Sequence, residues 1–226
     1  MEAAEAAKIV AAQKSLELVK DGMVVGLGSG STATHFIKLL GVKVKDGLRI
    51  RSISSSKASE DLARSLQIPI TDFRQAPEID VAIDGADEIG PHLALVKGGG
   101  GALLREKIVA SAAKHFIVVA DSSKIVRRLG KFPLPVEVIP MAAPLVEKKI
   151  LALGISSKVR QAKTGGDYIT DEGNLILDCA CGEIADPGAL AASIRAMVGV
   201  VEHGLFLNMA EMALVADGAE VKTIYK

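Results

Sequence analysis

The first half of the chain alternates short apolar runs with longer segments in which apolar residues recur at helical spacing. Strands that alternate with helices in this way are typical of a parallel sheet with helices on both faces. Ligands of such sheets bind beyond the carboxyl ends of the strands. After an N-terminal helix, the predicted strands are Met23–Leu27, Arg49–Ser54, Val81–Asp84 and Phe116–Ala120, and the predicted helices are Ser31–Leu40, Ala58–Leu66 and Leu103–Lys114.

The pattern changes at Lys131. The segment FPLPVEVIP contains three prolines, which favours an extended, linker-like start to a second domain. The order strand, helix, two strands, helix, strand that follows is close to a ferredoxin-like arrangement. Two final apolar runs, Ala210–Val215 and Glu220–Tyr225, fit the sheet of either domain. The other elements of this half are predicted at Val136–Ile139, Pro144–Leu153, Lys158–Ala162, Asn174–Asp178, Pro187–Met197 and Val200–Phe206, with a turn at residues 171–173.

Composition limits the partners of the chain. Aromatic residues make up 3% and Trp is absent, so aliphatic residues must fill the core, as in buried parallel sheets. Lys plus Arg equals Asp plus Glu at 27 each, and no basic stripe is present, so we expect no nucleic-acid partner. An anionic substrate must therefore be met by a local site.

The N-terminal segment MEAAEAAKIVAAQ carries Glu2 and Glu5 and lacks the basic start of a signal peptide. No uncharged apolar run approaches the ~18 residues of a membrane span, so we expect no membrane partner. Cys179 and Cys181 are too close along the chain for a comfortable disulfide, and no third ligand accompanies them. We expect two buried thiols in a cytoplasmic protein.

A glycine-rich turn, GLGSGST at residues 26–32, follows the first predicted strand and opens a helix. Glycines let the backbone approach a ligand, and a helix N-terminus presents N–H groups to an anion. A dinucleotide fingerprint would need a third glycine at Ser31, and a P-loop would need a Gly-Lys-Ser/Thr sequence. The turn favours a small phosphate; the alternative is an ordinary turn in which Ser31 caps the helix.

Three carboxylates, Asp84, Asp87 and Glu88, follow the third predicted strand in the sequence DGADE. Without a cation to organise them, at least one of these groups should have a raised pKa. A Mg²⁺ or Ca²⁺ site is an alternative, because such ions prefer oxygen ligands. Lys97 downstream and the absence of EF-hand spacing argue against a metal site, and a solvated acidic turn is the third interpretation.

The segment KGGGG at residues 97–101 precedes the predicted helix that carries Glu106. Four successive glycines are entropically unfavourable unless the backbone surrounds a ligand, where the amides and Lys97 would stabilise a developing negative charge. Glu106 shares the apolar face of its helix with Leu103, Ala110 and Ala113. Partial desolvation there should raise its pKa toward the range of a general base. A surface glutamate paired with Arg105 or with the neighbours of Ala110 is the alternative.

Two lesser segments follow other strands. Ser54-Ser55-Ser56-Lys57 offers donors to a phosphate or a helix cap, and Lys124 in ADSSK fits a phosphate ligand or a solvated lysine equally well. The four histidines show no ligand spacing, so we expect structural roles for them.

Together these segments resemble the type A ribose-5-phosphate isomerases. The resemblance runs from about Met1 to Lys226 and is carried by GLGSGSTATHFI, SISSSKAS, DGADEI, KGGGGALLREKI, ADSSK, LGKFPLPVEVIP, GNLILD and VKTIYK, in that order. It implies an α/β fold with a Rossmann-like parallel-sheet domain (residues 1–130 and 205–226) and a smaller ferredoxin-like α+β domain (131–204). It also implies no metal or organic cofactor, and a homodimer or homotetramer.

The resemblance further implies an aldose–ketose isomerase that interconverts D-ribose 5-phosphate and D-ribulose 5-phosphate in the non-oxidative pentose phosphate pathway. Glu106 would be the base that moves a proton between C1 and C2, and Asp84, Asp87 and Lys97 would open the sugar ring and stabilise the enediolate. Leu104, Gly101 and Lys57 depart from the family pattern and leave the fine substrate preference open. The residues that would bind the substrate are Lys8, Ser29, Gly30, Ser31, Thr32, Asp84, Gly85, Ala86, Asp87, Lys97, Gly98, Gly99, Gly100 and Lys124.

Two other functions are compatible with some of the same residues. Coenzyme A transferases of related fold have a much larger chain. A non-catalytic sugar-phosphate-sensing domain normally carries a DNA-binding helical module, and only about twenty residues precede the first predicted strand. Such a sensor would also leave Glu106 without a role.

Overall fold

The computed structural model describes residues 3–226, so the expectations for Met1 and Glu2 lie outside it. The larger sheet has the strand order β13-β12-β6-β3-β1-β2, and every neighbouring pair is parallel except β12 with the edge strand β13. Its inner strands are almost wholly buried, which explains their continuous apolar sequences. The strands are β1 Val24–Leu27, β2 Arg51–Ser54, β3 Ile79–Asp84, β6 Ala113–Asp121, β12 Met212–Asp217 and β13 Glu220–Tyr225.

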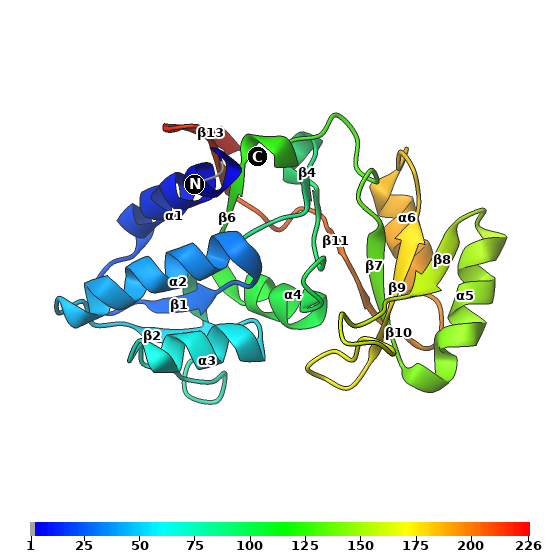
Figure 1. Cartoon of the computed structure of the whole chain (residues 1–226), viewed down its shortest axis with the longest axis horizontal. Coiled ribbons are helices and arrows are strands. Elements are labelled where there is room, and N and C mark those ends of the chain that lie inside the picture. Colours follow the sequence, from blue (N-terminus) through cyan, green and yellow to red (C-terminus); the bar gives the residue numbers. More distant parts are fainter. Residues whose placement is uncertain (1–2) are drawn as a thin grey trace. The chain divides into compact units, whose positions relative to one another are not determined.

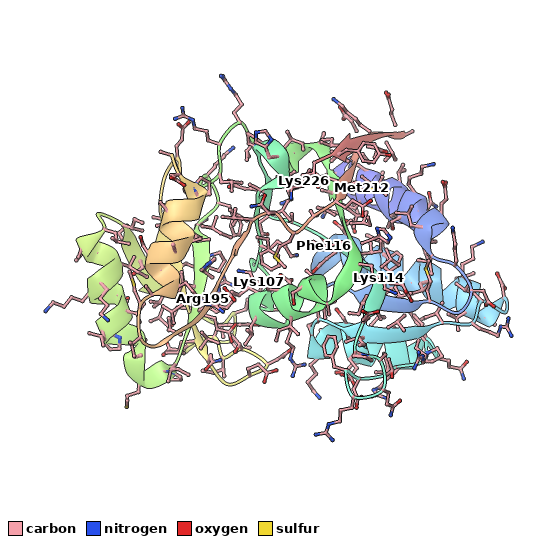
Figure 2. All side chains as sticks on the ribbon, turned by 180° about the vertical axis from the view of Figure 1, so that it is seen from behind. Lys107, Lys114, Phe116, Arg195, Met212 and Lys226 are labelled. Atoms are coloured by element: carbon pink, nitrogen blue, oxygen red, sulfur yellow. The ribbon has the colours of Figure 1, made fainter. Side chains whose placement is uncertain are left out.

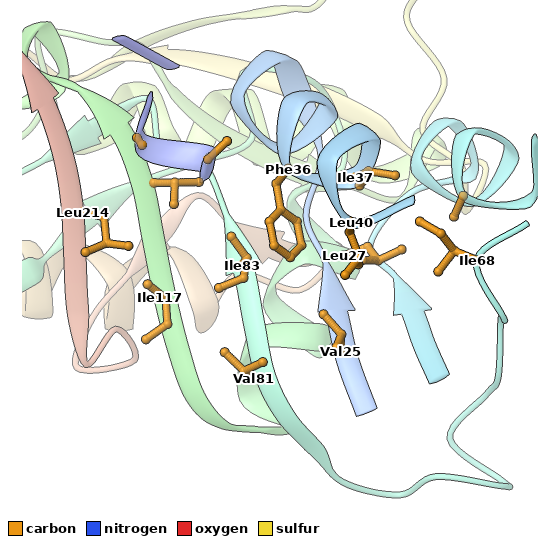
Figure 3. Close-up of a cluster of buried hydrophobic side chains, with 14 of the residues drawn as sticks. Val25, Leu27, Phe36, Ile37, Leu40, Ile68, Val81, Ile83, Ile117 and Leu214 are labelled. Carbon is orange, nitrogen blue, oxygen red and sulfur yellow. The ribbon is translucent and has the colours of Figure 1, made fainter. Parts of the chain in front are cut away.

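Helices cover both faces of this sheet (Figure 1). One face carries a core in which alternate strand residues such as Val25 and Ile83 meet Phe36, Ile37 and Leu40 (Figure 3). The last three residues form the apolar stripe of α2. On the other face, Gly26 leaves room for Val109 of α4. The helices are α1 Ala3–Ser15, α2 Gly30–Lys45, α3 Lys57–Ser65 and α4 Leu103–Ser111, with the 3-10 turns η1 Leu16–Leu18 and η3 Ser122–Lys124.

A second sheet has the strand order β10-β7-β9-β8 and is antiparallel throughout. With two helices between its strands, this is the ferredoxin-like arrangement expected from the sequence. Asp186 caps α6 by accepting from the Ala189 N–H, and Pro187 occupies the first turn, where its missing N–H is harmless. The elements are β7 Leu134–Val138, η4 Pro140–Ala142, α5 Ala143–Ala152, β8 Ser156–Val159, β9 Leu175–Ala180, α6 Pro187–Arg195 and β10 Val200–His203.

Three short strands form a further sheet that periodicity did not predict. Its order is β11-β5-β4, and its strands are β4 Glu88–Ile89, β5 Leu95–Val96 and β11 Leu205–Phe206, with the 3-10 turn η2 Pro91–Leu93 between the first two. Two residues are too few to show an alternation, so these strands are invisible in a hydropathy pattern.

The chain divides into two compact units. The first comprises the residues up to Ala86, Arg105–Lys124 and Asn208–Lys226, and the second comprises Asp87–Leu104 and Ile125–Leu207. The sequence-based division at residues 130 and 131 differs from this one because the segment 87–104 pairs its strands with β11 and so packs with the second unit. The last two strands join the sheet of the first unit.

Several predicted boundaries were wrong. The helix expected to run to Lys114 ends at Ser111, because Ala113 pairs with Ile79 as the start of β6. The strand expected at residues 158–162 is β8, which ends at Val159. The run 200–206 is divided between two sheets.

Charged side chains such as Lys114 and Arg195 lie on the surface (Figure 2). Among the described residues, no helix is both long and apolar enough to cross a membrane. Cys179 is buried as expected, whereas Cys181 is only half-buried, and both are free thiols.

Candidate active site

The loop after β1 leads directly into the N-terminus of α2. Ser29 is the N-cap residue of α2, but its side chain makes no capping hydrogen bond. Gly30 has φ +82°, a conformation that side chains disfavour, and with Ser31 it is exposed. The alternative in which Ser31 caps the helix is therefore wrong, and the first amides of α2 are not satisfied by a cap.

Ser29 connects two buried carboxylates of the first unit. Its backbone N–H donates to Asp84 Oδ1 at 3.0 Å, and its hydroxyl donates to Glu106 Oε1. Asp84 Oδ1 also accepts from the Gly85 N–H at 2.7 Å. Asp84 is 4% exposed and Glu106 is 5% exposed. Two carboxylates from different elements thus contact one serine at the N-terminus of α2.

Glu106 lies in the first turn of α4, on its buried side. Leu103 and Ala110 of the same face are buried, as the sequence predicted, whereas Ala113 belongs to β6. Glu106 is therefore not on the surface, as the alternative interpretation required. The contact with Ser29 was not predicted, because 77 residues separate the two in the chain.

The absence of a side chain at Gly28 makes the approach of Asp84 possible. A Cβ on Gly28 would lie 2.3 Å from Asp84 Oδ1 and 2.6 Å from Asp84 Cα, so the strand itself would have to move. Gly28 also donates its N–H to the Ile83 carbonyl at 2.9 Å.

We expect Gly28→Ala to lower the free energy of unfolding by about 2 kcal/mol or more, since overpacking displaces β3. For a chain of this size this corresponds to a decrease in Tm of roughly 4–8 °C, measurable by thermal unfolding. Gly188→Ala is the matched control, because a Cβ there meets only Asp186 Oδ1, at 3.3 Å. Equal Tm values for the two variants would contradict this account of Gly28.

The second unit holds Asp87, Lys97 and the tetraglycine segment. Asp87 Oδ2 accepts from the Gly99 N–H at 2.7 Å, so the acidic segment and the tetraglycine segment meet. Lys97 is 2% exposed, and its Nζ lies 5.5 Å from the centre of the Phe206 ring, a cation–π distance. A buried lysine and an amide-bound aspartate are thus held within one unit. Glu88, by contrast, is structural, accepting from the N–H groups of Gly130 and Phe132, both at 2.6 Å.

Two further lysines assigned to the substrate, Lys8 and Lys124, lie on other elements of the first unit. Lys8 of α1 is half-buried, and its Nζ lies 3.2 Å from Glu5 Oε2. His35 of α2 lies 2.6 Å from the other oxygen of Glu5. Lys124 ends η3, which follows the carboxyl end of β6, the neighbour of β3.

The serine segment after β2 supports the same loop. Ser56 caps α3 by accepting from the Ser59 N–H at 3.0 Å, as the capping interpretation predicted. The Ser59 hydroxyl donates to the Gly28 carbonyl at 2.6 Å. Sequence reasoning missed Ser59, although an S-x-x-S spacing at a helix start was a usable signal.

Within residues 3–226, no group of three or more His, Cys, Asp or Glu side chains is arranged to hold a metal ion. The fold and these contacts define a two-unit α/β protein with a carboxylate pair at an uncapped helix N-terminus. The family model "Ribose 5-phosphate isomerase A (phosphoriboisomerase A)" matches residues 51–220. The chain belongs to this family.

Relatives and solved structures agree with this assignment over almost the whole chain. The ribose-5-phosphate isomerase A of Sphingopyxis alaskensis is 48% identical over 98% of this chain and 96% of its own length. That of Roseiflexus sp. (strain RS-1) is 51% identical over 91% and 90%. A solved D-ribose-5-phosphate isomerase in complex with phospho-erythronic acid superposes with a TM-score of 0.96 at 39% identity, covering 99% of both chains. The isomerase of Methanocaldococcus jannaschii gives 0.93 at 41% identity, covering 97% of this chain and 98% of its own.

Proposed function

We propose that the chain interconverts D-ribose 5-phosphate and D-ribulose 5-phosphate by proton transfer through an enediolate. The observation that carries this proposal is Glu106, a buried carboxylate held by the Ser29 hydroxyl at the N-terminus of α2. A carboxylate removed from water is suited to act as a base, and a helix N-terminus is suited to bind phosphate. Relatives that match more than nine-tenths of the chain are named ribose-5-phosphate isomerase A.

In the proposed reaction, one base serves two neighbouring carbons. Glu106 takes the proton from C2 of the open-chain aldose, and the electron pair of that bond forms the C1–C2 double bond while O1 accumulates negative charge. The proton of the C2 hydroxyl moves to O1, which leaves the charge on O2. Glu106 then returns its proton to C1, and the ketose forms. A single carboxylate can do this because C1 and C2 of a planar cis-enediolate are both accessible from the same side of the plane.

Asp84, Asp87 and Lys97 complete the proposed chemistry. The sugar is mainly cyclic in solution, so a carboxylate must accept the proton of the C1 hydroxyl while the ring oxygen receives one. We assign ring opening to Asp84 and Asp87, and stabilisation of the enediolate charge to Lys97. A fixed cation stabilises a developing oxyanion without reorganisation.

We assign substrate binding to the loops around these groups. The amides and hydroxyls of Gly30, Ser31 and Thr32 would hold the phosphate, while Ser29 positions Glu106. Lys8 and Lys124 would supply positive charge. The backbone amides expected to meet the sugar are those of Gly85, Ala86, Gly98 and Gly100, while Gly99 donates its N–H to Asp87.

The ligand of the solved relative supports the same class of substrate. Phospho-erythronic acid is a phosphorylated sugar acid, and its planar carboxylate has the charge and shape of an enediolate. A protein that stabilises an enediolate should bind such a compound more tightly than a neutral sugar phosphate.

The direct test is incubation with ribose 5-phosphate and detection of the ketopentose product. Formation of ribulose 5-phosphate supports the proposal. Binding of ribose 5-phosphate without turnover would instead favour the non-catalytic sugar-phosphate-sensing alternative.

We expect activity to survive EDTA and exhaustive dialysis, because Lys97 is assigned the neutralising role that a divalent ion would otherwise fill. The measurement is the initial rate on ribose 5-phosphate before and after chelation. Loss of activity that Mg²⁺ or Mn²⁺ restores would contradict the metal-free mechanism and make Asp84 and Asp87 candidate ligands.

We also propose a homodimer or homotetramer in the cytoplasm. We further propose that the first unit, which carries Glu106, is the Rossmann-like domain. Light scattering coupled to size exclusion distinguishes the two oligomers from a monomer.

A further inference from the structure

Arg160 lies just beyond the end of β8, on a backbone that is fixed on both sides. Its N–H donates to the Ile176 carbonyl at 2.8 Å, and its carbonyl accepts from the Tyr168 N–H at 2.8 Å. The side chain is only 13% exposed. The guanidinium therefore occupies a defined position in the second unit.

Asp178 of β9 holds one edge of the guanidinium. Arg160 Nε donates to Asp178 Oδ2 at 3.0 Å, and Nη2 donates to Asp178 Oδ1 at 2.5 Å. This two-bond fork fixes the plane of the guanidinium, which a lysine could not do. The ring of Tyr168 lies 6.0 Å from Arg160 Cζ and covers the cation.

The remaining nitrogen of Arg160 binds the tetraglycine segment. Nη1 donates to the carbonyl of Gly98 at 2.8 Å and to that of Gly99 at 3.2 Å. Because the peptide bond is trans, each carbonyl and the N–H of the next residue point in opposite directions. Arg160 therefore turns the N–H groups of Gly99 and Gly100 away from itself.

The Gly99 N–H is the donor that binds Asp87 Oδ2 at 2.7 Å. One peptide unit thus links a cation to a catalytic candidate, since the Gly98 carbonyl accepts from Arg160 while the N–H of the same peptide donates to Asp87. Hydrogen bonds in such a chain polarise one another. We infer that Arg160, fixed by Asp178, is a positioning residue that orients the tetraglycine segment and Asp87 for the reaction.

This inference deepens the proposed function, because it rests on the role of Asp87 in opening the sugar. Four flexible glycines have no side chains with which to hold themselves, and an external clamp removes that freedom before substrate arrives. The expected signature is a loss of turnover with little change in substrate binding, since the groups assigned to the phosphate belong to other segments.

Arg160→Met removes the cation and keeps most of the apolar stem. Loss of charge-assisted hydrogen bonds should lower kcat at least ~10-fold, while KM for ribose 5-phosphate changes by no more than about threefold. Hydrogen exchange of the Gly99 amide should accelerate, as measured by NMR or mass spectrometry. Millimolar guanidinium should restore part of the lost kcat, whereas the same concentration of tetramethylammonium should not. Asp178→Asn, which weakens the fork but leaves the cation, should give a smaller loss of the same kind.

Arg128→Met is the control, because Arg128 makes an exposed ion pair with Glu183 in the same unit. It should change neither kcat nor Gly99 exchange. A folded Arg160→Met protein with unchanged Gly99 exchange, or one with unchanged kcat, would overturn the inference. A further outcome is that the unaltered chain fails to isomerise ribose 5-phosphate while Arg160→Met still accelerates Gly99 exchange. That result would refute the proposed function and still support the conclusion that Arg160 holds the tetraglycine segment in place.

Discussion

Glu106→Gln is expected to lower the turnover of ribose 5-phosphate by at least ~10²–10⁴-fold, the usual contribution of a positioned acid–base group. Glutamine has nearly the same size, and its carbonyl oxygen can still accept from the Ser29 hydroxyl that now binds Glu106. Only basicity is removed, so substrate binding should change little. In heavy water the variant should also stop exchanging the C2 proton of the sugar, which proton NMR measures directly.

Two further variants test whether the loss is specific to proton transfer by Glu106. Glu60→Gln, on helix α3, should behave as the unaltered protein, because Glu60 makes an ion pair with the exposed Arg64 of the same helix. Asp87→Asn should slow ring opening but spare proton exchange in substrate that is already open-chain. Near-normal exchange of the C2 proton by Glu106→Gln would show that another group is the base, and Asp84, which contacts the same serine, would be examined next.

Unphosphorylated ribose is expected to lose orders of magnitude in kcat/KM relative to ribose 5-phosphate. The reason is that binding energy from the remote phosphate can be used to position C1 and C2 against Glu106. The double variant Thr32→Val with Lys124→Met should shrink this preference, mainly by lowering kcat/KM for the phosphorylated sugar. The measurement is the ratio of kcat/KM values for the two sugars in each protein.

Lys38→Met serves as the control for the phosphate assignment, because Lys38 is an exposed lysine further along α2. It changes the net charge by the same amount as Lys124→Met without altering the helix N-terminus. If the double variant retained the full preference for ribose 5-phosphate, the phosphate would bind elsewhere.

Most of the fold was predictable from the sequence, because its strands and helices are long enough for their periods to be seen. The inner strands β1 and β3 are continuous apolar runs, and α2 has a clear apolar stripe. The strands β4, β5 and β11 contain two residues each and leave no pattern. They also determine that residues 87–104 pack with the second unit, which explains why the expected domain boundary differed.

The candidate residues could be picked out from the sequence, but the contacts between them could not. Glycines, carboxylates and Lys97 stood out because each is unfavourable at such a position unless it binds something. The bridge from Ser29 to Asp84 and Glu106 depends on strand order, which the sequence does not state. Arg160 was missed for a different reason: an arginine in a hairpin is ordinary, and only the fold brings Gly98 to it.

The two free thiols of the second unit provide a means of following its opening. Burial raises the pKa of Cys181 to about 11 and raises the pKa of Cys179 further above its usual range. The thiolate is the form that alkylating reagents attack, so both cysteines should be almost inert near neutral pH while the unit is folded. They are the only cysteines in the chain, and both belong to β9 or the residue just after it. The rate of alkylation would therefore report transient unfolding of the ferredoxin-like sheet alone, and comparing it with loss of activity would reveal whether the two units unfold together.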